Sequence, residues 1–284
     1  MTHLAIPKTY KLYIGGKFPR SESGRTYGVL SARGAFLANA AKASRKDARD
    51  AVVAARAAVP GWSGATGYNR GQVLYRIAEL LEGRRAQFVD EIGATEGVSA
   101  AAAGRQVDDA IDLWIWYAGW ADKYVQVAGN GNPVSGPYFN ISTPEPTGVV
   151  AIVAPQDSAL LGLVSVLAPA LVAGNTVVVL ASERLPLSAI SLSEVLATSD
   201  VPGGVVNVLT GSTAEITPWL ASHADVNALD LAGAGALEWI DLQIAAADSL
   251  KRVLPPETGV AAPTVERVTF FTETKTVWHT KALI

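Results

Sequence analysis

The second half of the chain alternates between short aliphatic runs and helical patterns. The runs are rich in β-branched residues and occupy 149–153, 176–180, 205–209 and 228–231. Continuous apolar runs of this length are typical of strands buried on both faces of a parallel sheet. The helices expected beside them span 158–172, 187–198, 214–222 and 236–249. This order predicts an α/β fold with a doubly wound parallel sheet, Rossmann-like, and a fifth strand is expected to begin at Val253.

The first half is predicted to be mainly helical. Residues 10–18 favour a hairpin that turns at Gly15-Gly16, and Ser44 with Asp47 three residues later is typical of a capping box. The helix that begins there is expected to stop at Pro60. Two more amphipathic helices are expected, over about 73–82 and 100–124. The second carries several aromatic residues at helical spacing, which favours a packing role: Trp114, Trp116, Tyr117 and Trp120.

Two segments outside these patterns are predicted to be extended. Gly, Pro, Asn and Ser dominate 129–147 around a short run at Tyr138–Ser142, which indicates a linker or projecting arm. Residues 265–277 alternate at period two, as in a strand. We therefore divide the chain into a hairpin with helices, a projecting β arm, a Rossmann-like part and a terminal strand: 1–135, 136–147, 148–260 and 261–284.

Composition excludes several classes of function. The chain has 284 residues, of which 49% are hydrophobic and 17% charged, enough for a sizeable core. Its net charge is −3 without a block of basic residues, so nucleic acid is not expected as a partner. Met1–Lys11 lacks the apolar core of a signal peptide, and no apolar run is long enough for a membrane span. We expect a soluble cytoplasmic protein without a membrane partner.

The chain contains no cysteine, which excludes disulfides, thiolate metal sites and a thiol nucleophile. The three histidines, His3, His223 and His279, fall in different predicted elements. Neither a metal site nor a Ser-His-Asp arrangement is therefore indicated, and no Gly-x-Ser-x-Gly elbow occurs. We predict no metal-binding residues.

Several segments, in the right order, resemble the aldehyde dehydrogenase superfamily. Tyr13–Lys17 is similar to its opening hairpin, and Asp50–Ala58 to its first helix. Ala170–Val178 resembles its helix-to-strand signature, Pro202–Gly211 a following segment, and Phe271–Trp278 the end of a complete member. The resemblance covers nearly the whole chain. It implies a Rossmann-like cofactor domain and a small β arm for oligomerisation, from a family of NAD(P)-dependent enzymes.

The resemblance also implies that the catalytic parts of the family are missing. In the family, a catalytic domain with the nucleophilic cysteine follows the cofactor domain, whereas here Val253 is followed almost at once by the terminal strand. Asp157 matches the asparagine that donates to the oxyanion, and an ionised carboxylate has no proton to donate. The family's catalytic glutamate falls at Pro256, with Glu257 one place away. We predict no catalytic residues.

The cofactor positions of the family are only partly matched. Glu183 matches the glutamate that binds the adenosine ribose, but Leu180 replaces its lysine partner. Gly211 is the one glycine kept in its segment, and Gly233-Ala234 replaces the Gly-Ser at the phosphate-facing helix. Glu183, Gly211 and Gly233 are therefore the vestigial cofactor-binding residues. We expect no cofactor, or weak NAD association at the helix start near Gly233.

These observations predict an aldehyde dehydrogenase-like pseudoenzyme that acts through oligomerisation. In the family, the arm and terminal strand, here about 136–146 and 265–278, pair together and extend the catalytic-domain sheet of a neighbour. The expected partners are a second copy, giving a homodimer, or a full-length aldehyde dehydrogenase, giving a hetero-oligomer. The alternative is a sensor that binds NAD(P) weakly, or a residual oxidoreductase of the aldehyde dehydrogenase superfamily.

Overall fold

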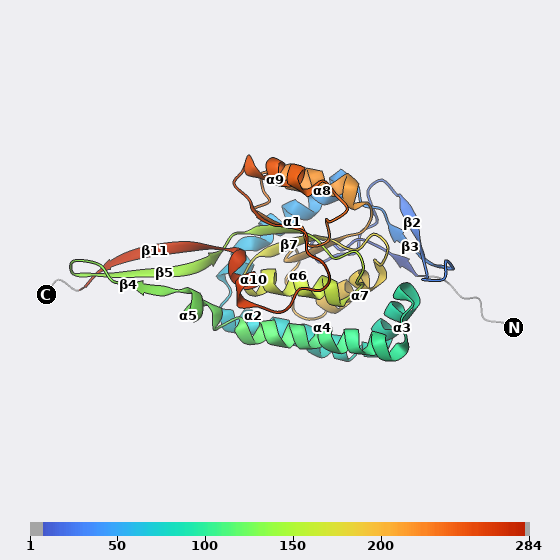
Figure 1. The fold of residues 1–284 in the computed structure, drawn as a ribbon, viewed down its shortest axis with the longest axis horizontal. Coiled ribbons are helices and arrows are strands. Elements are labelled where there is room, and N and C mark those ends of the chain that lie inside the picture. Colours follow the sequence, from blue (N-terminus) through green and yellow to red (C-terminus); the bar gives the residue numbers. More distant parts are fainter. Residues whose placement is uncertain (1–7, 282–284) are drawn as a thin grey trace.

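The computed structural model describes residues 8–281 (Figure 1). His3, most of the segment Met1–Lys11 and the end of the predicted terminal region 261–284 lie outside the described residues. A five-stranded parallel sheet with the order β10-β9-β6-β7-β8 forms the centre. Its strands are β6 (Val149–Val153), β7 (Thr176–Leu180), β8 (Val206–Leu209), β9 (Ala228–Asp230) and β10 (Arg252–Leu254). The expected doubly wound α/β fold is confirmed, and every residue of β6 and β7 is buried, which explains their continuous apolar sequence.

Helices cover both faces of this sheet (Figure 1). One face carries α2 (Gly67–Glu82), α3 (Arg85–Glu96), α4 (Ala100–Trp120), α6 (Leu161–Val172) and α7 (Leu187–Leu196). The other carries α1 (Arg45–Gly64), α8 (Thr213–Ser222) and α9 (Trp239–Ala247). Trp114 and Tyr117 are buried in the hydrophobic core on the side of the sheet that carries α4 and α6, as their spacing predicted. Among the helices of residues 8–281, none is both long enough and apolar enough to cross a bilayer.

The first helix begins where the sequence predicted but extends further. Ser44 accepts hydrogen bonds from the amides of Lys46 and Asp47, and the Asp47 carboxylate accepts the Ser44 amide at 2.8 Å, which completes the capping box. The prediction that Pro60 ends the helix is wrong, because α1 continues through Pro60 to Gly64. The last turn is held by Trp62, which is buried and donates its indole N–H to the Leu171 carbonyl at 3.1 Å. This tertiary contact outweighs the backbone hydrogen bond that proline cannot make.

A small sheet lies at the N-terminal end of the body, with the order β1-β3-β2. Its strands are β1 (Thr9–Tyr10), β2 (Thr26–Leu30) and β3 (Phe36–Ala41). The hairpin predicted over 10–18 is reduced to a tight turn: Gly15 and Gly16 have φ of 60° and 78° and close one bridge between Ile14 and Lys17. Tyr13 instead exchanges two backbone hydrogen bonds with Val208 of β8. The turn therefore closes against the edge of the central sheet.

A three-stranded arm projects from the body (Figure 1). It follows the short helix α5 (Tyr124–Ala128) and comprises β4 (Asn130–Asn132), β5 (Tyr138–Pro146) and β11 (Thr272–Thr280), in the order β11-β5-β4. The extended structure predicted over 265–277 is wrong at its beginning, because Val265–Phe270 forms the helix α10. Thr264 caps this helix by accepting the Arg267 amide, and Val268 and Phe271 are fully buried in the body. The strand begins only after this anchor.

Candidate functional site

The carboxyl ends of the parallel strands form the candidate site. Doubly wound folds bind ligands at this edge, at the point where strand order reverses. Here β6 lies between β7 and β9, so the reversal falls between β6 and β9. The loops that follow these strands contain most of the residues that the sequence selected, including Asp157 and Gly233.

Gly233 is required by close backbone packing at this reversal. Its amide donates to the Val153 carbonyl at 2.8 Å. A Cβ atom at this position would lie 1.8 Å from the Ala154 carbonyl oxygen, a distance no side chain permits. The next residue, Ala234, is buried and donates to the Leu231 carbonyl. Gly233 therefore joins the ends of β6 and β9 directly.

The helix expected to begin close to Gly233 begins later. Two tight turns occupy the segment, with Ala234 donating to Leu231 and Leu237 donating to Ala234. The helix α9 starts at Trp239, and Glu238 is its N-cap residue. The first turn of α9 contains Asp241, and the Glu238 side chain makes no capping hydrogen bond. The expectation of an anion-attracting helix start near Gly233 is wrong, because turns replace the first helical residues.

Gln156 ties together the loops after β6 and β7. Its side-chain oxygen accepts the Glu183 amide at 2.9 Å, and its side-chain nitrogen donates to the Ala154 carbonyl at 2.7 Å. Its backbone carbonyl also accepts the Ser182 hydroxyl at 2.9 Å. Sequence reasoning selected only the neighbouring Asp157, which is exposed. No sequence pattern marks Gln156, since its role depends on a contact across 27 residues.

Glu183 and Gly211 are brought together at the start of α8. A carboxylate oxygen of Glu183 accepts the Thr213 amide at 3.3 Å, which places negative charge at the helix N-terminus. Gly211 has a φ of 125°, and a Cβ there would lie 3.1 Å from the Ala43 amide nitrogen. Gly211 follows β8 and Gly233 follows β9, and β6 and β7 lie between these two strands in the sheet. Gly233 therefore lies apart from Gly211. Leu180 is fully buried in the core on the α8 side of the sheet.

Tyr27 of β2 is a candidate that sequence reasoning missed. Its hydroxyl oxygen is buried and makes no hydrogen bond of good geometry within residues 8–281. Burial, and then the negative charge of Glu183, raise the pKa of Tyr27, and the Gly211 backbone partly offsets this rise. Tyr27 thus lies near the exposed Glu183 carboxylate, but its own hydroxyl oxygen is closed to a ligand. The Glu183 carboxylate is able to accept hydrogen bonds from a ligand that carries hydroxyls.

A buried ion-pair cluster occupies the other end of this edge. Asp230 ends β9 and is fully buried, and its carboxylate accepts the Arg267 guanidinium at 2.8 Å. Arg267 also donates to Glu257 at 2.6 Å. Burial raises the pKa of Asp230 to about 6, although the charge of Arg267 opposes this rise. Glu257, next to the position of the family's catalytic glutamate, is thus engaged in a structural ion pair.

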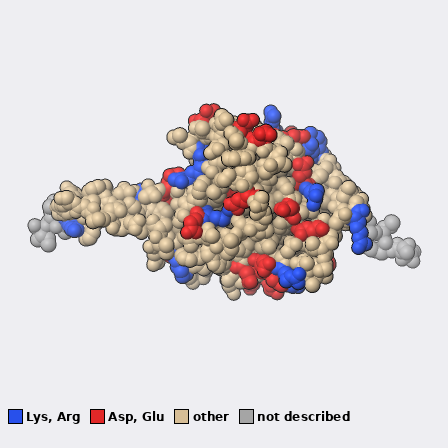
Figure 2. Space-filling model, in the orientation of Figure 1, with Lys and Arg blue, Asp and Glu red and all other residues tan. Residues whose placement is uncertain are grey.

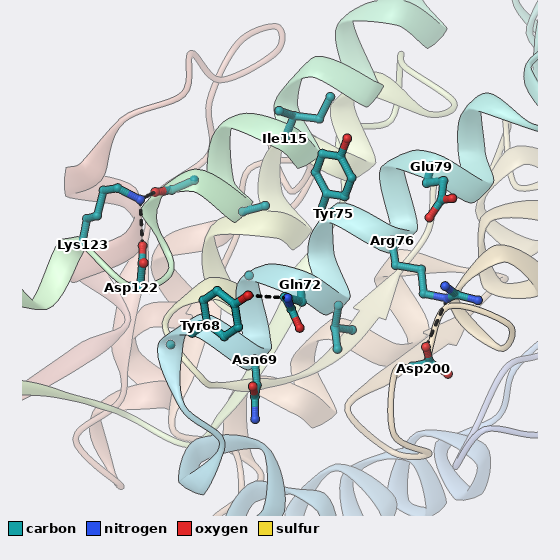
Figure 3. A pocket seen from close by; sticks show the side chains of 15 residues that line it. Tyr68, Asn69, Gln72, Tyr75, Arg76, Glu79, Ile115, Asp122, Lys123 and Asp200 are labelled. Carbon is teal, nitrogen blue, oxygen red and sulfur yellow. Dashed lines mark hydrogen bonds and ion pairs between the residues drawn. The ribbon is translucent and has the colours of Figure 1, made fainter.

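A wide cavity of about 800 Å³ lies away from this edge, on the outer surface of α2 and α4 (Figure 3). Tyr68, Tyr75 and Ile115 line it and are exposed. Four of its five charged side chains are paired with each other, Arg76 with Asp200 and Lys123 with Asp122, and Glu79 is the fifth. It contains none of the residues that the sequence selected for a cofactor.

Comparisons with known proteins identify the family. The sequence model of the aldehyde dehydrogenase family matches residues 20–265. The chain is 32% identical over 259 residues to cytosolic aldehyde dehydrogenase 1 of Elephantulus edwardii. This match covers 89% of this chain and 51% of that protein. It is 33% identical over 251 residues to retinal dehydrogenase 2 of Gallus gallus, covering 87% and 48% respectively. The chain belongs to the aldehyde dehydrogenase family.

Solved structures agree with this assignment. HpcC from Thermus thermophilus matches with a TM-score of 0.81 at 30% identity, over 87% of this chain and 48% of that one. The NAD⁺ complex of an aldehyde dehydrogenase from Bacillus cereus matches with a TM-score of 0.80 at 26% identity, over 87% and 50%. The chain thus spans about half the length of the proteins it matches.

The Bacillus cereus complex corrects one of our expectations. We predicted no cofactor for this chain, yet a protein of the same fold and family was solved with NAD⁺. The lack of a lysine at Leu180 and of a serine at Ala234 was therefore an insufficient basis for excluding a cofactor. The family to which the chain belongs includes a member that was solved with NAD⁺.

Proposed function

We propose that this chain is a non-catalytic member of the aldehyde dehydrogenase family that acts through association, with a second copy when isolated and with an intact aldehyde dehydrogenase in the cell. The path of the chain after β10 carries this proposal. Residues 255–264 lead directly from β10 to α10, at the place where the resembled family has its catalytic domain. The chain has no cysteine to supply the nucleophile, but the arm that pairs β5 with β11 is present.

The arm supports association because it presents surface that proteins normally cover. Among the described residues β11 has a partner strand on one side only, which leaves backbone N–H and C=O groups on its other side for strand addition. Tyr138 and Trp278 contact each other on one face, and Phe139 and Ile141 lie on the other; all four are exposed. The visible face of the arm carries few charged side chains (Figure 2). These features favour a protein partner.

The outer face of α9 is a second candidate surface for association. A contact between two copies of this chain through α9 requires no other protein. Ile240 and Ile244 are four residues apart on this helix and are 58% and 65% exposed. Leu250, which follows the helix, is 92% exposed. An apolar stripe of this kind suits an isologous contact, in which the same helix of two copies meets across a two-fold axis. We assign the homodimer to this face.

A second candidate function is NAD(P) binding without turnover. The NAD⁺ complex of the Bacillus cereus relative favours it, because the matched region includes the whole carboxyl edge. The residues present fit part of such a ligand, because Glu183 offers an exposed carboxylate that suits ribose hydroxyls. The chain would then sense or buffer the nucleotide.

Light scattering on the purified chain tests the association. We expect a dimer for the wild type, a monomer for Ile244→Lys, and co-elution with an intact aldehyde dehydrogenase that is lost in Trp278→Lys. Tyr68→Lys is the matched control, because Tyr68 is 62% exposed on α2, away from both surfaces. A wild-type monomer that does not co-elute with an intact dehydrogenase would contradict the proposal.

A further inference from the structure

A small cavity of about 200 Å³ lies at the N-terminal sheet, beside β1 and β3. Three cationic side chains line it, Lys11, Arg20 and Arg25, together with polar groups that include Thr26 and Asn39. We propose that this cavity binds the phosphate group of a small molecule. The proposal concerns a different part of the molecule from the carboxyl edge of the parallel sheet and does not depend on association or on NAD.

The backbone builds the walls of the cavity. Thr9 pairs with Asn39 across β1 and β3, and Thr26 pairs with Ala41 across β2 and β3. Residues 39 and 41 are two apart in β3, so they share one face of the sheet with Thr9 and Thr26, and Lys11 follows β1 directly. The segment 20–25 covers this face.

Internal hydrogen bonds hold the covering segment. Ser21 donates its hydroxyl to Asp47 at 2.7 Å, and the Glu22 amide donates to the same carboxylate at 3.0 Å. The Gly24 amide donates to the Ser21 carbonyl at 2.9 Å. Asp47 belongs to the capping box of α1, so these hydrogen bonds link the covering segment to that helix. These hydrogen bonds position the backbone of residues 21–24.

The charge around the cavity is unbalanced. Among the described residues, no carboxylate lines it. Asp47 uses both of its oxygens on Ser21, Glu22 and Ser44, and the Glu22 carboxylate accepts the Ser44 hydroxyl at 2.9 Å. The carboxylates of Asp47 and Glu22 thus form hydrogen bonds outside the cavity. The charge of the described lining is therefore positive.

Several donors on the walls lack acceptors. Within the part of the chain that the structure describes, the side chains of Lys11, Arg20, Thr26 and Asn39 make no hydrogen bond or ion pair. Arg25 has only a long contact with Glu215 at 3.9 Å and a bond from its Nε to the Ser23 hydroxyl at 3.3 Å. These side chains are exposed, so their donors face solvent and remain available to an oxyanion.

The size of the cavity limits the ligand. The cavity measures about 200 Å³, against about 800 Å³ for the cavity on α2 and α4, which favours a small anion over a dinucleotide. The chain as a whole has a net charge of −3, which does not favour a nucleic acid. Inorganic phosphate and a small phosphomonoester both carry the phosphate group that the cavity is proposed to bind.

Calorimetric titration tests the site, with inorganic phosphate and glycerol 3-phosphate as probes at constant ionic strength. We expect binding of at least one probe, weakened about tenfold or more in Arg20→Gln and further in the Lys11→Gln/Arg20→Gln double variant, because each loses charge-assisted hydrogen bonds. Lys17→Gln is the matched control, since Lys17 is exposed on the adjacent turn and does not line the cavity. Circular dichroism verifies that the variants are folded.

The two probes distinguish the source of the phosphate. Equal affinity assigns the site to the free ion, and tighter binding of glycerol 3-phosphate assigns it to a phosphorylated metabolite. Either result supports the site, provided that the double variant loses the binding. Absence of binding at millimolar concentrations, or binding that the double variant retains as well as Lys17→Gln does, would overturn the proposal.

Discussion

Arg267 of α10 donates a 2.8 Å hydrogen bond to Asp230 at the end of β9, and both side chains are removed from solvent. The pair joins the segment that precedes β11 to the parallel sheet. It therefore fixes the route by which the chain passes from β10 to the arm without an intervening domain. Removing one partner of a buried pair leaves an uncompensated charge, which costs far more than the pair itself contributes.

The first prediction concerns the stability of this connection. Arg267→Leu is expected to lower the free energy of unfolding by about 3–5 kcal/mol, because Asp230 is left buried without a partner. Arg252→Leu is the control: Arg252 pairs with Glu273 at 2.7 Å on the surface, and loss of such a pair costs about 0–1 kcal/mol. Urea unfolding measures both. Equal losses in the two variants would show that the buried pair has no special role.

The second prediction is a pH dependence. Burial raises the pKa of Asp230 to about 6 in the folded state, against about 3.9 when unfolded. Between these values the folded protein holds more protons than the unfolded chain, so this group makes stability fall as pH rises, by up to about 1.4 kcal/mol per pH unit. Asp230→Asn removes this contribution. The difference in unfolding free energy between wild type and variant should change between pH 4 and 6, and a constant difference would refute the assignment.

The sequence predicted the central sheet well because burial there is local and complete. The runs at 149–153 and 176–180 match β6 and β7 residue for residue, since both faces of these strands are covered. The segment 265–270 was mistaken for a strand because its alternation fits period two, and six residues are too few to reveal a helix. Its conformation depends on Arg267 reaching Asp230, a contact across 37 residues that no local pattern contains.

The candidate site was predictable only where a family motif marks it. The resemblance placed Glu183, Gly211 and Gly233 at the carboxyl edge, where the structure also has them. It did not indicate Gln156 or Tyr27, whose positions depend on loops and strands that meet only after folding. It also misplaced the start of α9, because the turns of 231–237 depend on packing against β6 and β10.

The third prediction tests the packing at the strand reversal. Gly233→Ala places a Cβ 1.8 Å from the Ala154 carbonyl oxygen, so the backbone must shift. We expect a loss of stability at or above the upper end of the ~1–3 kcal/mol that overpacking usually costs. Gly235→Ala is the matched control, since the nearest atom to its Cβ, on Pro256, is 4.0 Å away. Thermal unfolding compares them, and two similar melting temperatures would contradict the structure at this position.

The fourth prediction is the absence of aldehyde oxidation. A chain without cysteine has no thiolate to attack an aldehyde, and Asp157 supplies no donor for an oxyanion when it is ionised. Purified protein mixed with varied aldehydes and NAD⁺ or NADP⁺ is expected to form no reduced cofactor above a blank in an absorbance assay. The control is a cysteine-containing aldehyde dehydrogenase in the same assay. Turnover that follows this chain through further purification would refute the non-catalytic proposal.

The last prediction concerns nucleotide binding at the carboxyl edge. If this edge binds NAD⁺ as proposed, the exposed Glu183 carboxylate accepts hydrogen bonds from the ribose. Glu183→Gln keeps an oxygen that can still accept the Thr213 amide, so the start of α8 is preserved while the charge is lost. Hydrogen bonds to charged groups contribute about 1.5–3 kcal/mol, so the Kd for NAD⁺ should rise about tenfold or more.

Tyr27→Phe should leave the Kd for NAD⁺ unchanged, because the hydroxyl oxygen that it removes is buried and closed to a ligand. Glu266→Gln is the control for the change of charge, since Glu266 lies on α10, away from the start of α8. Calorimetric titration measures all four proteins. Wild-type binding that Glu183→Gln does not weaken would place the nucleotide elsewhere. No measurable binding by the wild type would leave association as the proposed function, because the arm and the α9 face do not depend on the nucleotide.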